Sequence, residues 1–269
     1  MRATLRNPCG MITGIRLDHV AVAAERWEDA WPRYAHELGG QWVGGGETPG
    51  FAAHQMEFAN GMRLELLRPH AVESNDFLRR FLDRNGPGPH HLTFKVPDIV
   101  TAIAEAEAAG YRPVNVDIGD PLWKEAFLHP KDIPGVVVQL AESHGDWRTP
   151  PAAGFPESVH GEPASLDRVV HAVASLDEGL RLFAGLLAGE EADRGDDEHG
   201  RWVDLAWPGP GRVRLVEPAP GTDAAQWVGD RAGRVHHVAF TCPWLDDGPV
   251  VVEPQDNLGT RLVLSPQVS

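Results

Sequence analysis

Residues 17–23 read LDHVAVA, and residues 166–172, which lie 149 positions later, read LDRVVHA. In both copies the alternation of side chains predicts a strand. Each strand leads into apolar residues at positions i, i+4, i+7 and i+11, which form one stripe of an amphipathic helix. The stripes are Trp27, Trp31, Tyr34 and Leu38 in the first copy and Leu176, Leu180, Phe183 and Leu187 in the second. This self-similarity predicts a fold assembled from repeated units.

The repeat continues beyond the helices. Residues 64–69 (LELLRP) match residues 213–218 (VRLVEP) at the same offset. Residues 89–94 (PHHLTF) resemble residues 235–240 (VHHVAF) at an offset of 146. The two halves of the chain are therefore predicted to share one fold, with a short deletion in the second half.

The first half also repeats within itself. One unit opens with the strand that carries His19, and the next opens with the strand that carries His91 and continues through a helix at 99–109. Each unit reads β-α-β-β-β, so we predict an α+β chain of two fused domains with two paired units each. The fourth unit is expected to be truncated, because residues 243–249 leave no room for its helix.

Composition and punctuation give the expected domain boundaries. An N-terminal extension is predicted at residues 1–13, followed by a first domain at 14–143 and a second domain at 164–266. Residues 144–163 are rich in proline and glycine, which is typical of a linker.

Charge and cysteine content limit the partners. The net charge of −15 argues against nucleic acid, because proteins that bind it need a basic face. No apolar run approaches the roughly 18–20 residues of a membrane span, and the N-terminus lacks the apolar stretch of a secretory signal. Cys9 and Cys242 have no metal-type spacing and are expected to be free thiols in the cytoplasm. The expected partner is a small molecule.

Four strand-like segments in the first half each carry one potential metal ligand. These residues are His19, Glu65, His91 and Gln139. Around His91, the apolar Leu92 and Phe94 point to the opposite side, so each strand is expected to pack one side under helices and to line a polar cup with the other. Imidazole nitrogens with carboxylate and amide oxygens suit one divalent ion, such as cobalt, manganese, nickel, zinc or iron.

These segments resemble the vicinal oxygen chelate superfamily, which includes glyoxalase, bleomycin resistance and extradiol dioxygenase proteins. Residues 15–142 are most similar to its methylmalonyl-CoA epimerase branch, also through 127–131 (FLHPK) and 135–140 (GVVVQL). Residues 165–264 resemble a degenerate second copy. The resemblance implies that paired units form an open eight-stranded cup around a divalent metal. It assigns the ligands to the first, fourth, fifth and eighth strands, which are His19, Glu65, His91 and Gln139.

The resemblance also implies a function. The expected activity is that of a divalent-metal-dependent isomerase or epimerase, which abstracts a proton α to a carbonyl through a metal-stabilised enolate. An acyl-CoA such as methylmalonyl-CoA is the implied substrate. Two alternatives stay open: a non-catalytic small-molecule-binding or resistance protein, and a ferrous-iron dioxygenase with two histidines and one carboxylate as ligands.

One departure from the epimerase pattern affects proton transfer. That branch has glutamine on the fourth strand and glutamate on the eighth, whereas this chain has Glu65 and Gln139. An amide does not transfer protons, so Glu65 is expected to be both ligand and base. A second acid or base is expected in the segment that carries His54, Gln55 and Glu57. His54 and Glu57 have opposite strand parity, so at most one of the two faces the cup.

Three residues are expected to contact the substrate. Lys95 shares the side of His91, and Trp123 belongs to the segment 115–126 that is expected to shape the mouth of the cup. Lys131 follows the seventh strand and is expected to meet a phosphate of a coenzyme A tail.

The second domain lacks the metal ligands. It offers Arg168, Arg214, His237 and Val263 at the four equivalent positions. Two arginines and a valine do not bind a dication, so no metal is expected there. Its expected role is to cover the first domain as a second subunit would, which predicts a monomer with an intramolecular pseudo-dimer or a homodimer. A lesser alternative is that Arg168 and Arg214 bind an anion.

Overall fold

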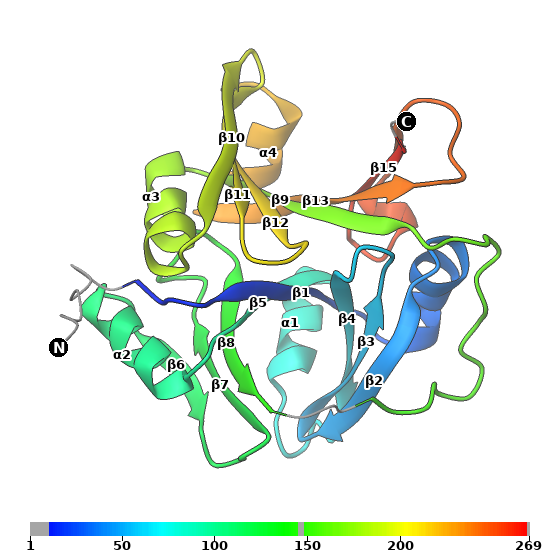
Figure 1. Ribbon diagram of the computed structural model, residues 1–269, viewed down its shortest axis with the longest axis horizontal. Helices are drawn as coiled ribbons and strands as arrows, with labels where there is room; N and C mark the ends of the chain where they lie inside the picture. The colour runs from blue at the N-terminus through cyan, green and yellow to red at the C-terminus, as the bar shows by residue number, and fades with distance from the viewer. Residues whose placement is uncertain (1–10, 145–147, 268–269) are drawn as a thin grey trace, which may run out of the picture.

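The computed structural model describes residues 11–144 and 148–267 and contains two curled sheets (Figure 1). Sheet A belongs to the first half, has eight strands and follows the order β2-β3-β4-β1-β5-β8-β7-β6. Its strands are β1 (Arg16–Ala23), β2 (Gln41–Thr48), β3 (Gly50–Glu57), β4 (Arg63–His70), β5 (Gly88–Lys95), β6 (Pro113–Asp117), β7 (Trp123–Leu128) and β8 (Val137–Ser143). This is the predicted α+β fold with an open eight-stranded cup.

Sheet B has the same order in the second half but only seven strands in the described ranges, β10-β11-β12-β9-β13-β15-β14. Its strands are β9 (Ser165–Val173), β10 (Glu190–Asp197), β11 (Gly200–Ala206), β12 (Arg212–Pro218), β13 (Gly233–Cys242), β14 (Val250–Val252) and β15 (Leu262–Pro266). The last unit has three strands and, between them, only the short turn η4 (Pro254–Asp256). The predicted truncation is therefore confirmed, whereas the exact domain boundaries stay predictions.

Strand β1 joins the two units of sheet A. It pairs in parallel with β4 and antiparallel with β5, as β9 does with β12 and β13. In this register Ala21 lies between Glu65 on one side and His91 on the other. The side chains of Glu65 and His91 therefore lie on the same side of the sheet as that of Ala21. His19 comes two residues earlier on the same strand, so its side chain lies on that side too.

The predicted helical stripes pack into the main core, with Trp27 and Leu180 partly buried, although the helices are short. The first stripe lies in or next to η1 (Trp27–Asp29) and η2 (Pro32–Glu37), and the second in or next to α3 (Leu176–Leu180) and η3 (Arg181–Leu186). Both end in a wide turn, in which Leu38 N bonds Arg33 O and Leu187 N bonds Leu182 O, five residues back. The predicted helix at 99–109 is α2 (Ile99–Ala108), which is capped by the Asp98 side chain.

Two helices were not predicted, α1 (Phe77–Asn85) and its counterpart α4 (Asp223–Val228). Leu78 and Leu82 of α1 pack on Ala21, Ala23 and Leu67 of sheet A, in a small core separate from the main one. Ala21 and Ala23 alternate with the main-core residues of β1, so α1 packs on the side of sheet A that faces away from the main core (Figure 1).

The two domains share one continuous core. Phe94 packs on Trp207 with ring centroids 5.1 Å apart, and Phe58 packs on Phe240 at 5.0 Å. At Gly135, where φ is +75°, the backbone passes so close to Gly233 that no side chain fits. The two domains are therefore packed against each other through a common hydrophobic core.

Residues 148–163 lie along the first domain. Thr149 Oγ1 accepts hydrogen bonds from Trp42 Nε1 and Gly45 N, and Phe155 packs on the ring of Trp42 at 5.3 Å. The described part of the linker is thus a packed segment. No helix in the described ranges is both long and apolar enough to cross a membrane.

Candidate metal centre

Three of the four predicted ligands meet in sheet A. His19 Nε2 lies 3.5 Å from Glu65 Oε2, and His91 Nε2 lies 3.6 Å from the same oxygen. The candidate ligand atoms all lie within 4.8 Å of one another. His19 is 0% exposed, His91 5% and Glu65 9%. The strands β1, β4 and β5 therefore place two imidazoles and one carboxylate around a single buried point.

The donor atoms at that point lack hydrogen bonds. The Nε2 atoms of His19 and His91 are both buried without a partner, although buried polar atoms in proteins are nearly always hydrogen-bonded. The other nitrogen of each ring is held, since His19 Nδ1 lies 2.9 Å from Asp18 Oδ2 and His91 Nδ1 lies 2.8 Å from His90 Nδ1. Two imidazole nitrogens that face one carboxylate oxygen fit a divalent cation, and a carboxylate behind a ligating imidazole is a common support of such ions.

Without a cation the electrostatics favour a protonated His19, an ionised Glu65 and a neutral His91. Burial lowers the pKa of His19, but the charge of Glu65 and the contact with Asp18 outweigh it and raise that pKa to about 9. Burial likewise opposes ionisation of Glu65, but the charge of His19 outweighs it and lowers the Glu65 pKa to about 2. The pKa of His91 is well below its ordinary value because of burial and the neighbouring His90. His91 is thus a neutral ligand already.

Gln55 of β3 orients Glu65. Its Nε2 lies 3.2 Å from Glu65 Oε1 and 3.1 Å from His19 Nδ1, while its Oε1 is buried without a partner. The amide holds one carboxylate oxygen, so the other faces the two imidazoles. Of the candidates on this strand, Gln55 is the residue that lies at the centre.

Gln139 of β8 lies beside this group and is hydrogen-bonded at both ends of its amide. Its Oε1 accepts a hydrogen bond from Thr93 Oγ1 at 2.5 Å, and its Nε2 donates to Glu125 Oε2 at 2.6 Å. The Oε1 atom of Gln139 has two lone pairs, so the hydrogen bond from Thr93 leaves one lone pair for coordination of a metal ion. A ligand role for Gln139 stays a prediction.

Glu125 of β7 was missed by the sequence reasoning. Its carboxylate accepts hydrogen bonds from Gln139 Nε2 and, at 2.7 Å, from Trp123 Nε1, and burial raises its pKa. The alternation of Trp123, Glu125 and Phe127 along β7 was the available signal, because it places all three on one side of the strand. This half-buried carboxylate forms the wall of the cup next to Gln139.

Lys95 and Trp123 lie together on the same wall. Lys95 Nζ is 3.5 Å from the centroid of the Trp123 ring and has no hydrogen-bond partner. Burial lowers the pKa of Lys95 to about 8, against the opposing charges of Asp18 and Glu65. Two of the three residues expected to contact the substrate are therefore adjacent.

The other candidates lie away from the centre. His54 is enclosed by aromatic rings, where it stacks on Trp42 at 4.3 Å and accepts a hydrogen bond from Trp31 Nε1, and burial lowers its pKa to about 3. Glu57 forms an ion pair with Arg63 at 2.9 Å. Lys131 is exposed on the turn before β8. Their proposed roles stay predictions to which these positions add no support.

The second cup holds an ion-pair cluster at the equivalent place. Arg168, Asp204 and Arg214 lie 149 positions after His19, Gln55 and Glu65, respectively. Arg168 Nη1 is 3.0 Å from Asp204 Oδ2, and Arg214 bonds both oxygens of the same carboxylate at 2.7 and 2.6 Å. The guanidinium groups supply positive charge where the first cup offers ligands for a cation.

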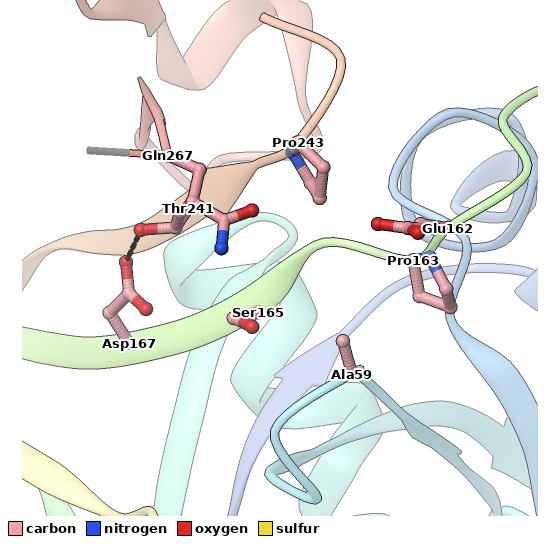
Figure 2. Close-up of a pocket in the computed structure, with 8 residues that line it drawn as sticks. All are labelled: Ala59, Glu162, Pro163, Ser165, Asp167, Thr241, Pro243 and Gln267. Atoms are coloured by element: carbon pink, nitrogen blue, oxygen red, sulfur yellow. Dashed lines mark hydrogen bonds between the residues drawn. The ribbon is translucent and has the colours of Figure 1, made fainter. Parts of the chain in front are cut away.

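A separate pocket of about 350 Å³ lies where the linker meets sheet B (Figure 2). Thr241 Oγ1 donates a hydrogen bond to Asp167 Oδ2 on one of its walls at 2.5 Å. Its lining residues are Ala59, Glu162, Pro163, Ser165, Asp167, Thr241, Pro243 and Gln267. They include none of the candidate ligands, so this pocket is distinct from the metal centre.

The first half of the chain is similar in sequence to known proteins. Residues 18–127 match the family model of the glyoxalase/bleomycin resistance protein/dioxygenase superfamily. Human mitochondrial methylmalonyl-CoA epimerase is 31% identical over 147 residues, which are 51% of this chain and 82% of the relative. The ethylmalonyl-CoA/methylmalonyl-CoA epimerase of Cereibacter sphaeroides is 32% identical over 133 residues, 47% of this chain and 97% of the relative.

The chain belongs to the glyoxalase/bleomycin resistance/dioxygenase superfamily. These superfamily relatives match about half of the chain, and the residues matched by the family model contain His19, Glu65 and His91. A hypothetical protein from Staphylococcus aureus resembles the structure over 94% of this chain and 100% of its own, with a TM-score of 0.60 and 13% identity. That likeness shows the two-domain fold alone.

Proposed function

We propose that this chain is a divalent-metal-dependent epimerase or isomerase that moves a proton α to the carbonyl of an acyl-CoA, with methylmalonyl-CoA as the leading substrate. One observation carries the proposal: the unpartnered Nε2 atoms of His19 and His91 face Glu65 Oε2 inside the sheet. The names of the relatives supply the substrate class, since the human and Cereibacter proteins are called methylmalonyl-CoA epimerases.

His19, Glu65 and His91 would hold the ion, with Gln139 Oε1 as the fourth ligand. Cobalt, manganese, nickel, zinc and ferrous iron all accept this mixture of nitrogen and oxygen donors. When bound, the ion supplies positive charge that stabilises the negative charge developing on a carbonyl oxygen during proton removal. Gln55 and Asp18 position the ligands, because each holds an atom of Glu65 or His19 that does not face the centre.

Proton transfer at the α carbon needs a group that accepts the proton. The amides of Gln55 and Gln139 do not do so. We propose Glu65 as base as well as ligand, since its carboxylate lies at the centre. Glu125 is the second carboxylate on the cup wall, and its Oε2 lies 2.6 Å from Gln139 Nε2. Substitution of Glu65 and of Glu125, one at a time, tests which of the two carboxylates is the base.

The decisive test is proton NMR in D₂O of methylmalonyl-CoA with the protein and each metal in turn. The proposal expects exchange of the α proton that depends on both protein and metal and that is lost in His91→Ala. His199→Ala is the matched control, because His199 is exposed on the turn between β10 and β11. Absence of metal-dependent exchange with every metal would sink the epimerase assignment.

A ferrous-iron dioxygenase is the second candidate, favoured by the combination of two histidines and one carboxylate at the centre. Metal analysis of the protein, purified without added metal, separates the two. Abundant ferrous iron with oxygen consumption supports the dioxygenase, and cobalt, manganese, nickel or zinc supports the isomerase. Tight binding of acyl-CoA without exchange would instead identify a non-catalytic binding protein. The cytoplasmic location and the choice between monomer and homodimer stay predictions.

A further inference from the structure

Lys95 carries a buried charge without a hydrogen-bond acceptor. Its Nζ atom is buried and has no hydrogen-bond partner among the described residues. The face of Trp123, 3.5 Å away, compensates for part of the lost hydration through a cation–π contact. An ammonium has three N–H donors, and burying one without acceptors is costly. Such an arrangement is expected where a ligand completes the site.

The position of Lys95 connects it to the metal centre. His91, Thr93 and Lys95 alternate along β5, so their side chains lie on one side of the strand. The cross-strand neighbours of Lys95 are Ala141 on β8 and, beyond it, Glu125 on β7. Ala141, which stands between Lys95 and Glu125 in the sheet, has a small side chain. The ammonium therefore borders the same concave wall as the ligands.

The charges around Lys95 leave it open to an anion. Asp18 and Glu65 act on its charge from β1 and β4, and Arg16 and Arg63 oppose them from the same two strands. Neither carboxylate forms an ion pair with Lys95, since Asp18 contacts His19 and Glu65 faces the imidazoles. A dication bound at the centre would offset the charge of Glu65, which acts on Lys95 from β4.

We propose that Lys95 binds the free carboxylate of a malonyl-type acyl group and thereby selects thioesters that carry one. This inference rests on the proposed function. In such a substrate the carboxylate and the thioester flank the reacting α carbon, so a carboxylate ligand must sit beside the metal centre. The phosphates of coenzyme A lie at the far end of a long tail, whereas Lys95 Nζ has no exposed surface.

The test compares ligands that differ by one group. Malonyl-CoA and acetyl-CoA differ only in the carboxylate, and malonyl-pantetheine lacks the nucleotide phosphates. Their dissociation constants are measured by calorimetry with cobalt-loaded protein. A charge-assisted contact is expected to favour malonyl-CoA over acetyl-CoA by about 10- to 100-fold, and malonyl-pantetheine should keep the preference over acetyl-pantetheine. A wild-type protein that binds malonyl-CoA and acetyl-CoA equally overturns the proposal without any variant.

Lys95→Met removes the charge and keeps the length of the side chain. It is expected to lower the malonyl-to-acetyl preference to about onefold while acetyl-CoA affinity stays within about twofold. Lys124→Met is the matched control, because Lys124 lies on the opposite side of β7, paired with Glu142 at 2.7 Å. An unchanged preference in Lys95→Met overturns the proposal, and an equal loss for malonyl-CoA and acetyl-CoA points to a phosphate contact and also overturns it.

The two proposals fail in different ways. If the α proton never exchanges but malonyl-CoA binding depends on Lys95, the epimerase function falls and the carboxylate site stands. If the α proton exchanges and Lys95→Met leaves the ligand preference unchanged, the carboxylate site falls and the function stands.

Discussion

Asp18 and His19 are neighbours in the sequence and are also hydrogen-bonded to each other. The carboxylate of Asp18 lies 2.9 Å from Nδ1 of His19, at the place where the register between β1 and β5 shifts. In a regular strand these two side chains would point to opposite sides. The irregularity allows both to reach the same region, so a carboxylate supports the imidazole from behind.

Removing that support should weaken metal binding without removing a ligand. We expect Asp18→Asn to lower the affinity for cobalt or zinc by about 10- to 100-fold, the usual effect of losing such an outer partner. Competition with a coloured chelator measures it. Asp246→Asn, an exposed residue, should leave the affinity unchanged. Equal affinities in the two variants would contradict the supporting role.

Metal affinity should rise with pH. The cation must displace the proton on His19, whose pKa is raised to about 9 because the charges of Glu65 and Asp18 outweigh burial. Below that pKa, the apparent affinity is expected to increase by about tenfold per pH unit, since one proton is released per ion. Chelator competition between pH 6 and 8 tests this. A flat profile would mean that His19 is already deprotonated.

Stability of the metal-free protein should move in the opposite direction. The folded-state pKa of His19 lies above its ordinary value of 6.5, so the stabilisation is complete below that value and is lost as the pH rises through about 9. Urea unfolding of chelator-treated protein should therefore show a fall in unfolding free energy between pH 6.5 and 9. Glu65→Gln removes the negative charge that contributes most to raising the His19 pKa. The unfolding free energy of this variant should therefore change less between pH 6.5 and 9.

Substitution with glutamine should distinguish the roles of the two carboxylates of the cup, Glu65 and Glu125. Glu65→Gln is expected to reduce both metal affinity and α-proton exchange, because it removes the anionic ligand. Glu125→Gln can still accept hydrogen bonds from Trp123 and Gln139, so metal affinity should stay unchanged. If Glu65 is the base, exchange survives in Glu125→Gln. A loss of about 100-fold or more in exchange by Glu125→Gln, with metal still bound, would transfer that role to Glu125.

The contact between the domains should be sensitive to one methyl group. A side chain at Gly135 would collide with the backbone of Gly233 and would also have to adopt φ of +75°. We expect Gly135→Ala to lower the unfolding free energy by about 3 kcal/mol or more, measured by urea denaturation. Gly110 has φ of +86° and open space around it, so Gly110→Ala should cost about 1 kcal/mol from the backbone alone.

The sequence predicted the part of the site that alternation and repetition determine. His19, Glu65 and His91 stood on the polar side of three strands, and the pairing of β1 with β4 and β5 brings them together. The two units per domain and the missing helix of the last unit followed from the repeat. Long-range patterning is reliable here because a one-residue slip in register would turn every core residue outwards.

The missed features depend on local geometry. Asp18 contacts His19 because of an irregularity in β1, and no residue type in the sequence predicts that irregularity. His54 and Gln55 are adjacent, and alternation alone leaves open which of them faces the cup; the structure turns Gln55 inwards and His54 into aromatic packing. Glu125 was not among the predicted site residues, and the pairing of β7 with β8 reveals its contact with Gln139.

The cluster of Arg168, Asp204 and Arg214 has a consequence for symmetry. In a homodimer every substitution appears in both subunits, so a cup cannot lose its ligands on one side and keep them on the other. In the fused chain, His19 and its counterpart Arg168 are separate positions that change independently. One cup can therefore exchange its ligands for a permanent ion pair while it still packs on its neighbour. Among the described residues, the fused chain is therefore an asymmetric pair of cups, of which one carries a candidate metal centre.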